Sequence, residues 1–315
     1  MAASRSPRLR FTLRQLEYLV AVGEAGTIAE AAHRLNVSSP SISAAISQLE
    51  AEFGVQLFVR KPAHGLSLSA AGRLFLNEAK LLLRQGHNLY NVAHELQHEL
   101  SGTLSVGCMV TLAPVIAPEL CKSFMDAHPG IRIELLEGSH EDLLRRLSNV
   151  EIDIAVSYDL ARPDNLSFEP LSELVPHAVV SANSQLAALD TVSLEQLASE
   201  PMVLLDLPYS AQYFLSLFEV RGLTPNVVAR SGNQDVIRTM VANDYGYTIL
   251  NVRPKSLVAM DGRKLKTIRL AEQHTPTRIG VMTLAGTVKP RMLLAFEEHC
   301  RKTITRGSIP GMMQD

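Results

Sequence analysis

The sequence predicts a small all-α module that carries a β-hairpin, then one long helix, then an α/β body. Three observations support this fold class. Residues 12–54 contain three short segments with helical spacing of apolar residues, each bounded by capping residues. Residues 69–100 hold an unbroken heptad pattern. From residue 101 onward, short apolar strands alternate with amphipathic helices, which is typical of a parallel sheet covered by helices.

Composition and charge indicate a globular protein with an uneven charge distribution. Apolar residues make up 46% of the 315 residues and charged residues 20%, which is ordinary for a chain of two or three domains. No stretch of about 18 consecutive apolar residues occurs, so no membrane span is expected. Residues 1–99 carry two more basic than acidic residues, whereas the rest carries four more acidic than basic residues. A mildly basic front on an acidic body is compatible with nucleic-acid binding.

The N-terminus and the cysteines bear on the location of the protein. The first 15 residues, MAASRSPRLRFTLRQ, contain four Arg and no apolar signal-peptide core, so we expect a cytoplasmic protein. Cys108, Cys121 and Cys300 are too few and too scattered for a disulfide framework, and none has C-x-x-C spacing. We therefore predict three buried thiols, with a redox switch as the alternative.

Two capping patterns define the first two helices. Thr12 followed by Gln15 forms a capping box that starts one helix, and Gly26 ends it. Thr27 and Glu30 are expected to form a second capping box. The apolar residues inside both segments recur at helical spacing and should face a common core.

A tight turn joins the second helix to a third. Asn36 suits a left-handed turn, and Ser38 or Ser39 can cap the third helix. Pro40 is pre-organised for the first helical turn, and Gly54 stops the helix. Small alanines in the second helix allow the helices to approach closely, so the pattern predicts a helix-turn-helix.

A β-hairpin follows the third helix. The segment VQLFVRKPAHGLSLSAAG, residues 55–72, gives an apolar strand, a basic tip and a second strand. The tip contains Arg60, Lys61 and His64 together with a proline and a glycine. A hairpin here is a wing beside the helix-turn-helix, and it argues against a generic helical bundle.

The segment from Leu13 to Gly72, LRQLEYLVAVGEAGTIAEAAHRLNVSSPSISAAISQLEAEFGVQLFVRKPAHGLSLSAAG, resembles without a gap the DNA-binding domain of the LysR-type transcriptional regulators. The resemblance implies a sequence-specific regulator that responds to a small molecule, with no enzymatic activity, cofactor or metal. The partners it implies are double-stranded DNA, a small-molecule effector, a second copy of the chain and RNA polymerase. Family members often assemble further into tetramers.

The family's DNA-contacting positions carry over to the start of the third helix and to the wing. They are Ser38, Ser39, Pro40, Ser41, Ser43, Ala44, Arg60, Lys61 and His64. Family members often have Gln where this chain has Ser39, and Arg, Lys or Gln where it has Ala44. Between Arg34 and Arg60 the chain has no Lys or Arg. We therefore expect the helix to read shape and methyl groups, while its N-terminus, its hydroxyls and the flanking cations hold phosphates.

Ser69 can cap a long helix that runs to about Leu100. Its apolar residues follow one another at alternating spacings of four and three, which forms a heptad seam. The seam consists of Phe75, Ala79, Leu82, Gly86, Leu89, Ala93, Leu96 and Leu100. A lone helix cannot bury such a seam, and the resemblance implies that its partner is the same helix of a second subunit.

The end of this helix contains HELQH, residues 94–98, which matches the zinc-protease pattern H-E-x-x-H. His94, Glu95 and His98 fall at outer positions of the heptad, where no third ligand or dry cavity is at hand. A metalloprotease is therefore the weaker alternative function. Adventitious metal binding by the two histidines is a further interpretation of this segment. A solute-binding protein is a third interpretation, which the wing and the missing signal peptide oppose.

The remainder of the chain alternates strands with helices. Strands are predicted at 103–109, 131–138, 152–159, 177–182, 201–206, 226–231, 247–250 and 278–285, and helices at 113–129, 140–149, 210–222, 234–244 and 290–304. Two such subdomains joined by crossovers resemble the periplasmic-binding-protein fold of the LysR effector domain. The expected boundaries are a DNA-binding domain at 1–68, a linker helix at 69–100, an effector domain at 101–303 and a flexible tail at 304–315. Within the effector domain, subdomain one covers about 101–176 and 273–303, and subdomain two about 177–272.

By this resemblance the effector binds between the subdomains, near strand ends and helix starts. The carried-over positions are Met109, Val110, Thr111, Ser139, Tyr158, Leu207, Pro208, Ser231 and Asn233. Thr111, Ser139 and Ser231 are hydroxyls next to helix starts, which suits a carboxylate. A capping role is the alternative for each, and surface or core packing is the alternative for Tyr158. No Arg lies among these positions, which favours a monocarboxylate over a dianion or a phosphate ester.

Overall fold

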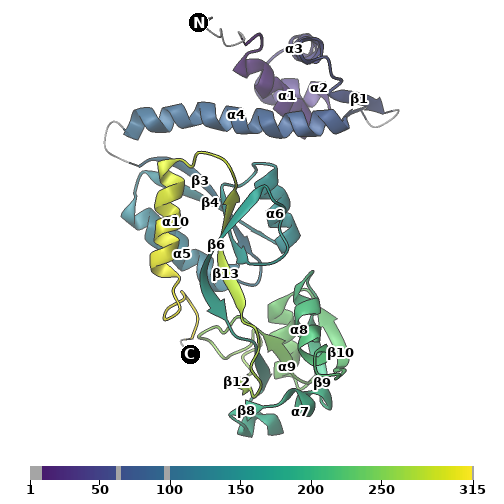
Figure 1. Cartoon of the computed structure of the whole chain (residues 1–315), viewed down its shortest axis with the longest axis vertical. Helices are drawn as coiled ribbons and strands as arrows, with labels where there is room; N and C mark the ends of the chain where they lie inside the picture. The colour runs from purple at the N-terminus through teal and green to yellow at the C-terminus, as the bar shows by residue number, and fades with distance from the viewer. Residues whose placement is uncertain (1–8, 62–64, 96–99, 314–315) are drawn as a thin grey trace, which may run out of the picture. The chain divides into compact units, whose positions relative to one another are not determined.

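The computed structural model describes residues 9–61, 65–95 and 100–313 (Figure 1). The chain divides into two compact units, residues 1–98 and residues 99–315, and each is described by itself. Within the described ranges, no helix is both long enough and apolar enough to cross a membrane.

The first unit contains the predicted winged helix-turn-helix. Its elements are α1 (Leu13–Ala25), α2 (Ile28–Leu35), α3 (Ser39–Phe53), β1 (Phe58–Lys61), β2 (Gly65–Leu68) and α4 (Ala70–Glu95). The strands β1 and β2 pair antiparallel and form the wing. Gly72 lets α4 approach the chain just before β1 closely, because a Cβ at this position would lie 2.0 Å from the carbonyl oxygen of Leu57.

One predicted capping box is complete and the other is half formed. Thr12 and Gln15 make both bonds of the box that starts α1. The Thr27 hydroxyl accepts a hydrogen bond from the Glu30 N–H, as expected. The Glu30 carboxylate, however, accepts from the Arg34 guanidinium at 3.2 Å rather than from the cap. The i,i+4 ion pair on the exposed face of α2 thus replaces the second half of the box.

The first part of α4 packs into the core of its own unit. Phe75 lies edge-on against Phe53, with ring centroids 4.5 Å apart, and Ala79 is buried. Leu82 and Leu89, further along the same seam, are exposed, Leu89 at 70%. The expectation that the whole seam needs a partner is therefore corrected, because its first residues are covered by α1 and α3. Further along, Leu82 and Leu89 are the described seam residues that remain exposed in their unit.

The first subdomain of the second unit is built on a five-stranded sheet with the order β4-β3-β5-β13-β6. Strands β3, β4 and β5 run parallel, and β13 is antiparallel to both β5 and β6. The sheet is mixed rather than parallel, because β13 returns from the other subdomain in the opposite direction. The elements are β3 (Gly102–Met109), α5 (Ala113–Ala127), β4 (Ile131–Gly138), α6 (His140–Ser148), β5 (Ile154–Tyr158), β6 (Leu166–Leu174), β13 (Thr277–Leu284) and α10 (Arg291–Thr303).

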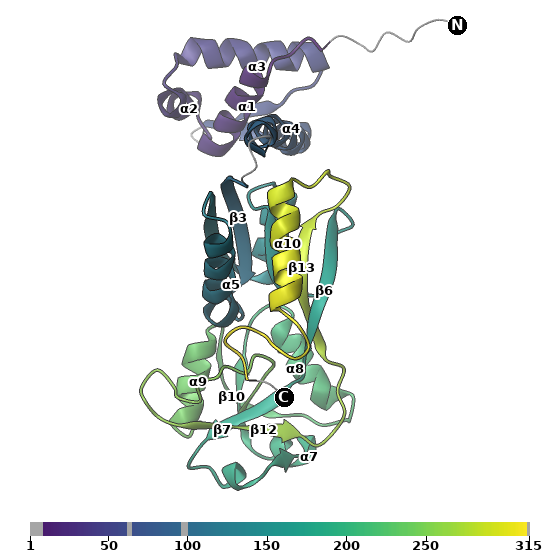
Figure 2. The same cartoon turned by 90° about the vertical axis from the view of Figure 1, so that its left-hand side faces the viewer.

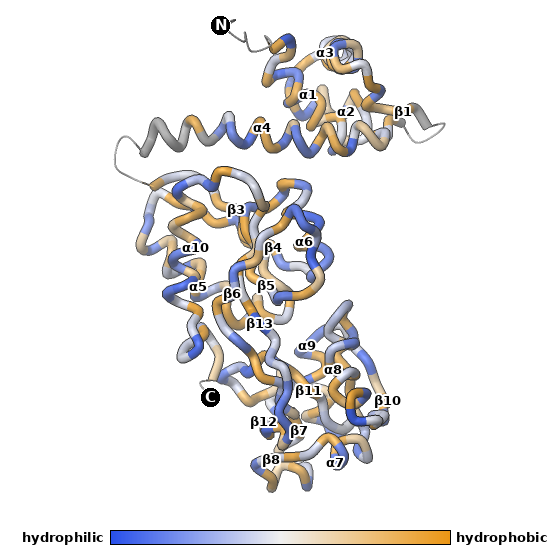
Figure 3. Tube along the Cα trace, viewed as in Figure 1, coloured by the Kyte–Doolittle hydropathy of each residue, from blue (hydrophilic) through white to orange (hydrophobic). Residues whose placement is uncertain are grey.

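Helices cover both faces of this sheet (Figure 1). Helices α5 and α10 pack side by side, with the rings of Phe124 and Phe296 edge to face at 5.0 Å. Helix α6 covers the other face. Most of its residues are hydrophilic in Figure 3, and its buried residues are His140, Leu143 and Leu147.

The second subdomain has its own core and two small sheets. The four-stranded sheet has the order β11-β7-β12-β8, and β10 pairs parallel with β9. The elements are β7 (His177–Ser181), a 3₁₀ turn η1 (Gln185–Ala188), β8 (Thr191–Val192), α7 (Leu194–Ala198), β9 (Pro201–Leu205), α8 (Ser210–Glu219), β10 (Asn226–Ser231), α9 (Gln234–Ala242), β11 (Thr248–Leu250) and β12 (Leu265–Leu270). Leu207 packs against both this core and the core of the first subdomain.

Two strands next to the crossovers between the subdomains, β6 and β12, were not predicted from the sequence. The chain passes from β6 to β7 at residues 175–176, and from β12 to β13 at residues 271–276. The edge strand β6 carries Pro170 at a register shift opposite Gly280. Polar and proline-containing strands of this kind lack the apolar run that marks the other strands.

Residues 304–313 are not the flexible tail that the sequence suggests. Ile304 and Met312 are buried, at 1% and 4% exposure. The Met313 N–H donates to the Arg253 carbonyl oxygen at 2.9 Å. Figure 2 shows this segment, in yellow, turning back from α10 toward the crossovers. A few apolar residues spaced among small polar ones anchor it, and such spacing carries no helix or strand signal.

Candidate functional site

The exposed start of α3 is the candidate DNA interface. The Ser38 Oγ accepts a hydrogen bond from the Ser41 N–H at 3.3 Å and lies 2.7 Å from the Ser41 Oγ. The opposite side of the helix is buried through Ile42 and Ile46. The predicted helix positions are all exposed to solvent: Ser38, Ser39, Pro40, Ser41, Ser43 and Ala44. This face therefore presents hydroxyl and methyl groups and carries no charge.

Positive charge at this interface comes from the flanking elements. Arg34, at the end of α2, is exposed and paired with Glu30. Arg60 and Lys61 lie in β1 of the wing. His64, which was predicted with them, lies outside the described residues.

A small cavity lies between the two subdomains of the second unit. Its volume is about 30 Å³, which is enough for about one or two water molecules. The lining residues are Thr111, Tyr158, Leu160, Leu205, Tyr209, Ser210, Tyr213, Phe214, Gln234, Leu250, Asn251, Val252 and Thr277. None of them is charged. The subdomains close tightly here, so any ligand larger than water requires that they move apart.

Two of the nine predicted effector positions, Thr111 and Tyr158, line this cavity. Their hydroxyl oxygens lie 3.1 Å apart and share a hydrogen bond, and both side chains are buried. Burial raises the pKa of the Tyr158 phenol, while the bond to Thr111 opposes the shift. The phenol is therefore neutral, and the pair can offer O–H groups to an anion.

The other predicted residues of the first subdomain have structural partners. Met109 lies in the core at 1% exposure. The Val110 N–H donates to the Gly138 carbonyl oxygen at 3.0 Å. Ser139 caps α6, because its Oγ accepts from the Asp142 N–H at 3.2 Å. The capping alternative thus describes Ser139 in this structure.

The predicted residues of the second subdomain do not line the cavity either. The Asn233 Oδ1 accepts from two N–H groups at the start of α9, at 2.9 and 3.2 Å. The Ser231 Oγ accepts from the Asn233 N–H at 3.2 Å. Leu207 is half-buried between the two cores, and Pro208 is exposed. These residues shape the start of α8 and α9 rather than the cavity wall.

The structure adds residues that the sequence analysis did not select. Tyr209, Tyr213 and Phe214 come from the start of α8, where their spacing indicates core packing rather than a site. Asn251 and Thr277 lie next to the crossovers, and the Asn251 Nδ2 donates to the Thr277 Oγ1 at 2.8 Å. Such a pairing depends on which strands meet in the fold, so no local signal marks it.

A buried histidine stands beside the cavity. The His140 Nε2 lies 3.0 Å from the Ala161 carbonyl oxygen, and its Nδ1 lies 3.2 Å from the Ser157 Oγ. A carbonyl oxygen only accepts, so Nε2 carries the proton and Nδ1 accepts from the serine. Desolvation lowers the pKa of His140, although the bond to Ala161 opposes this. The ring also contacts Tyr209 of the second subdomain.

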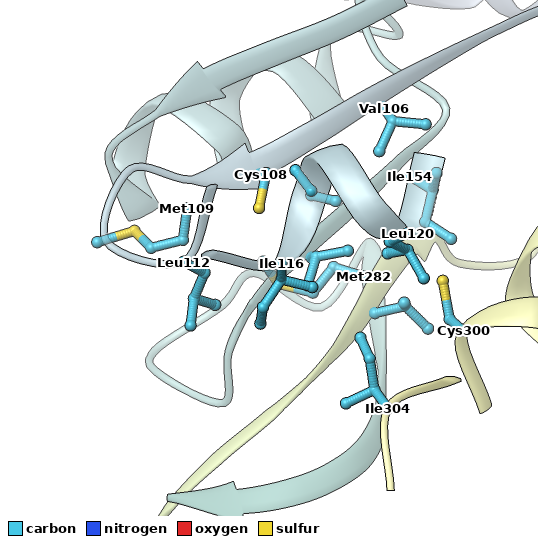
Figure 4. Packing of buried hydrophobic residues seen from close by; sticks show 14 of the residues in the cluster. Val106, Cys108, Met109, Leu112, Ile116, Leu120, Ile154, Met282, Cys300 and Ile304 are labelled. Carbon is cyan, nitrogen blue, oxygen red and sulfur yellow. The ribbon is translucent and has the colours of Figure 1, made fainter. Parts of the chain in front are cut away.

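The cysteines are structural. Cys108 and Cys300 lie in the core of the first subdomain (Figure 4), and Cys121 is buried next to it. Burial raises the pKa of all three thiols, that of Cys121 to about 11. The prediction of three buried thiols is confirmed.

The HELQH segment is only partly described. His94 and Glu95 end α4, and His98 lies outside the described residues. Among the residues that the structure does describe, no group of three His, Cys, Asp or Glu side chains is arranged to hold a metal ion.

Two protein-family models match this chain. The family model described as "LysR substrate binding domain" matches residues 97–305, and "Bacterial regulatory helix-turn-helix protein, lysR family" matches residues 13–73. The chain belongs to the LysR family. This LysR-type transcriptional regulator has a DNA-binding domain and an effector-binding domain, and its relatives are regulators rather than enzymes. The metalloprotease alternative finds no support among them.

Individual relatives agree with this assignment. HinK, a LysR family regulator from Pseudomonas aeruginosa, is 35% identical over 94% of this chain and 99% of its own, with a TM-score of 0.64. SsuR from Burkholderia cenocepacia is 28% identical over 94% of this chain and 96% of its own length. CbnR, solved in complex with its target DNA, is 22% identical over 93% of this chain and 99% of its own, with a TM-score of 0.61, which bears on the fold alone. The predicted periplasmic-binding-protein-like fold is confirmed.

Proposed function

We propose that this regulator binds operator DNA through the start of α3 and the wing, and that a small monocarboxylic acid between its subdomains alters that binding. The DNA-binding part of this proposal rests on the exposed and uncharged face of α3, next to a helix N-terminus that is capped by Ser38. A related fold, CbnR, has been solved with its target DNA.

The DNA contacts divide into two kinds. The free N–H groups and dipole at the start of α3, together with the hydroxyls of Ser38 and Ser39, hold a phosphate. Ser43 and Ala44 face base edges, where a serine hydroxyl bonds to several bases and an alanine methyl contacts a thymine methyl. Arg34, Arg60, Lys61 and His64 supply the charge that α3 lacks. Affinity then comes from the flanks, and specificity from shape and methyl contacts.

The effector proposal rests on the chemistry of the cleft cavity. Its lining holds two buried hydroxyls, on Thr111 and Tyr158, among apolar and aromatic walls. No cation lines it, so a single carboxylate held by O–H donors is favoured over a dianion. Because Ser139 is occupied as a cap, the carboxylate is assigned to Thr111 and Tyr158 rather than to Thr111 and Ser139.

Ligand entry must open the cleft. The cavity holds about one or two waters when the subdomains are closed, which is too small for an organic acid. An acid that binds the opened arrangement shifts the population of subdomain arrangements, and this shift is the signal available to the DNA-binding unit.

The test uses the full-length protein and a fluorescent duplex from the region upstream of its own gene. Benzoate and butyrate serve as probes, and benzamide and butyramide serve as matched neutral controls. We expect an acid to change the affinity for DNA while its amide does not. Thr111→Val should weaken the acid's effect at least tenfold, and Thr111→Ser, which keeps the hydroxyl, should not. If the amide changes the DNA affinity as much as the acid does, the ligand is not a carboxylate. If Thr111→Val responds to the acid as the parent does, the assigned contact with Thr111 is wrong.

Two partners complete the proposal. The exposed seam residues Leu82 and Leu89 of α4 are suited to pairing with the same helix of a second copy, and tetramers then form through further contacts. RNA polymerase is the proposed recipient of the regulatory signal at the promoter. Order-of-addition binding with purified RNA polymerase tests it: the regulator should change the amount of polymerase bound to the promoter duplex.

A further inference from the structure

A second and larger cavity lies on the crossovers that join the subdomains. Its volume is about 440 Å³, compared with about 30 Å³ for the cleft cavity. Four stretches of chain line it: 173–177, 251–253, 269–274 and 306–313. We call it the hinge cavity. It is separate from the effector cleft, and Asn251 is the one lining residue that the two share.

The C-terminal segment forms one wall of the hinge cavity. The Ser172 Oγ donates to the Thr305 carbonyl oxygen at 3.1 Å, and the Lys255 N–H donates to the Gly311 carbonyl oxygen at 3.0 Å. Gly311 has a φ of +70°, and a Cβ there would lie 2.3 Å from the Val115 carbonyl oxygen. The segment is therefore fitted closely to the body on one side, while its other side faces the cavity through Ile309 and Met312.

Several buried polar atoms along this cavity have no hydrogen-bond partner. They are the Nε2 of His177, the Oδ1 of Asn251, the Oε2 of Glu272 and the Nε2 of His274. The His177 residue is 4% exposed and the His274 side chain 3%. Buried polar atoms are almost always hydrogen-bonded in native proteins, so four unsatisfied atoms around one cavity indicate a missing bonded group.

The unsatisfied atoms define what that group must supply. The carboxylate oxygen of Glu272 and the amide oxygen of Asn251 are acceptors, so they require N–H or O–H donors. The His274 Nε2 lies 3.8 Å from the Glu272 Oε2, too far for a direct hydrogen bond. Desolvation lowers the pKa of both His177 and His274, so their rings are neutral and add no positive charge. The carboxylate of Glu272 attracts a cationic group, although Arg253, itself a cation, also lines the cavity.

The rim of the cavity supplies the opposite charge. Arg269 is exposed and stands across the β12–β7 ladder from His177. Arg306 is also exposed, and its contact with Glu173 at 3.4 Å is an exposed pair that a ligand can replace at small cost. Apolar side chains, among them Leu174, Ile309 and Met312, line the rest. The arrangement offers an anion site at the rim, a cation site inside and an apolar wall between them.

We propose that the hinge cavity is a second ligand-binding site, which takes a small amphoteric molecule of the amino-acid class. The ammonium group donates to Glu272 and Asn251, the carboxylate binds Arg269, and the side chain lies on the apolar wall. This site goes beyond the proposed function of the cleft. Asn251 also bonds to Thr277 of the cleft, and residues of both crossovers line the cavity. An occupant would therefore contact the two segments that join the subdomains.

The test measures binding to the full-length protein by isothermal titration. L-leucine, L-methionine and L-phenylalanine serve as probes, and two analogues of leucine each lack one charged group. 3-Methylbutylamine lacks the carboxylate, and 4-methylpentanoate lacks the ammonium group. The acid is titrated into Thr111→Val, so that the proposed carboxylate site of the cleft does not take it. We expect at least one amino acid to bind one per chain, and the two analogues of leucine to bind at least tenfold more weakly than leucine itself. No binding of any amino acid at millimolar concentration, or equal binding by leucine and an analogue, would overturn the proposal.

Variants assign the site. Glu272→Gln keeps the oxygen that accepts from the Leu194 N–H and removes the charge, and it should weaken binding at least tenfold. Arg269→Gln changes an exposed side chain and should do the same. Glu219→Gln, on the exposed end of α8 away from the cavity, and Thr111→Val in the cleft should leave the affinity unchanged. If Thr111→Val weakens binding while Glu272→Gln and Arg269→Gln do not, the amino acid occupies the cleft and the hinge site is wrong.

Discussion

His140 of the first subdomain and Tyr209 of the second meet edge to face beside the effector cleft, with ring centroids 5.5 Å apart. Tyr209 has a φ of 66° and a ψ of −37°, a conformation that residues with a side chain rarely adopt. Strained backbone of this kind persists where the surrounding structure holds it, often at ligand clamps. Tyr209 fits that description, because it lines the cleft cavity and touches both subdomains.

A pair of substitutions separates the backbone strain from the ring contact. Tyr209→Ala and Tyr209→Gly both remove the aromatic contact, but only glycine adopts a positive φ at no steric cost. We expect the glycine variant to be more stable than the alanine variant by about 1 kcal/mol, measured by urea unfolding followed by circular dichroism. An alanine variant as stable as the glycine variant would mean that the backbone is not strained at this position.

Local patterns in the sequence predict the DNA-binding unit well. The helices of this unit are bounded by residues whose effect acts within three or four positions, such as Thr12 with Gln15 and the glycines that end α1 and α3. Those interactions need no knowledge of the fold. Glu30 is the exception. Its carboxylate could bond either to the backbone N–H of Thr27 or to Arg34 one turn along the helix, and in the structure it pairs with Arg34.

The cleft is predicted only in part, because it depends on long-range pairing. Thr111 and Tyr158 are brought together by the parallel order of β3 and β5, which alternating strands and helices already imply. Asn251 and Thr277 meet because the chain crosses twice between subdomains. The hinge cavity is missed altogether, since the C-terminal segment that walls it has no regular secondary structure.

Acid should destabilise the second unit through His177. Burial, assisted by the charge of Arg253, lowers the pKa of this histidine from 6.5 to about 3. The unfolded chain therefore binds the proton more readily, and stability is complete above pH 6.5 and is lost as the pH falls from 6.5 toward 3. The expected slope from this residue is about 1.4 kcal/mol per pH unit.

The measurement compares urea unfolding of the parent and His177→Gln at several pH values below 6.5. The glutamine variant, whatever its absolute stability, should show a smaller slope by about 1 kcal/mol per pH unit. Parallel profiles for the parent and His177→Gln would contradict the assignment.

Operator binding should tolerate the loss of a hydroxyl on α3 but not the gain of a charge. Ser43 is exposed on the face assigned to the major groove. Ser43→Ala should cost on the order of 1 kcal/mol, because one hydrogen bond to a base is lost. Ser43→Glu should abolish binding, because a carboxylate faces the phosphates. Fluorescence anisotropy with operator duplex measures both, and equal affinity of Ser43→Glu and the parent would show that α3 is not in the groove.

The wing should contribute affinity without sequence preference. Arg60→Ala and Lys61→Ala each remove one cation from β1, so each should weaken binding to all sequences alike. Each should also reduce the slope of log affinity against log salt by about one unit, because one fewer counterion is released. Anisotropy titrations over a range of salt concentrations, on operator and on unrelated duplex, make the comparison. A changed sequence preference at an unchanged salt slope would instead indicate contacts to base edges.

The uncovered seam of α4 should be the dimer contact. Leu89 is 70% exposed on the same seam as the buried Ala79, so a partner helix is needed to cover it. Leu89→Asp would set two carboxylates against each other in an apolar interface, and we expect monomers at micromolar concentration in sedimentation velocity. Leu74→Asp is the matched control: Leu74 is 73% exposed on the same helix but lies off the heptad seam, so this variant should remain dimeric. If both variants are monomeric, circular dichroism shows whether α4 has unfolded. If both variants are dimeric, the dimer interface does not include the seam of α4.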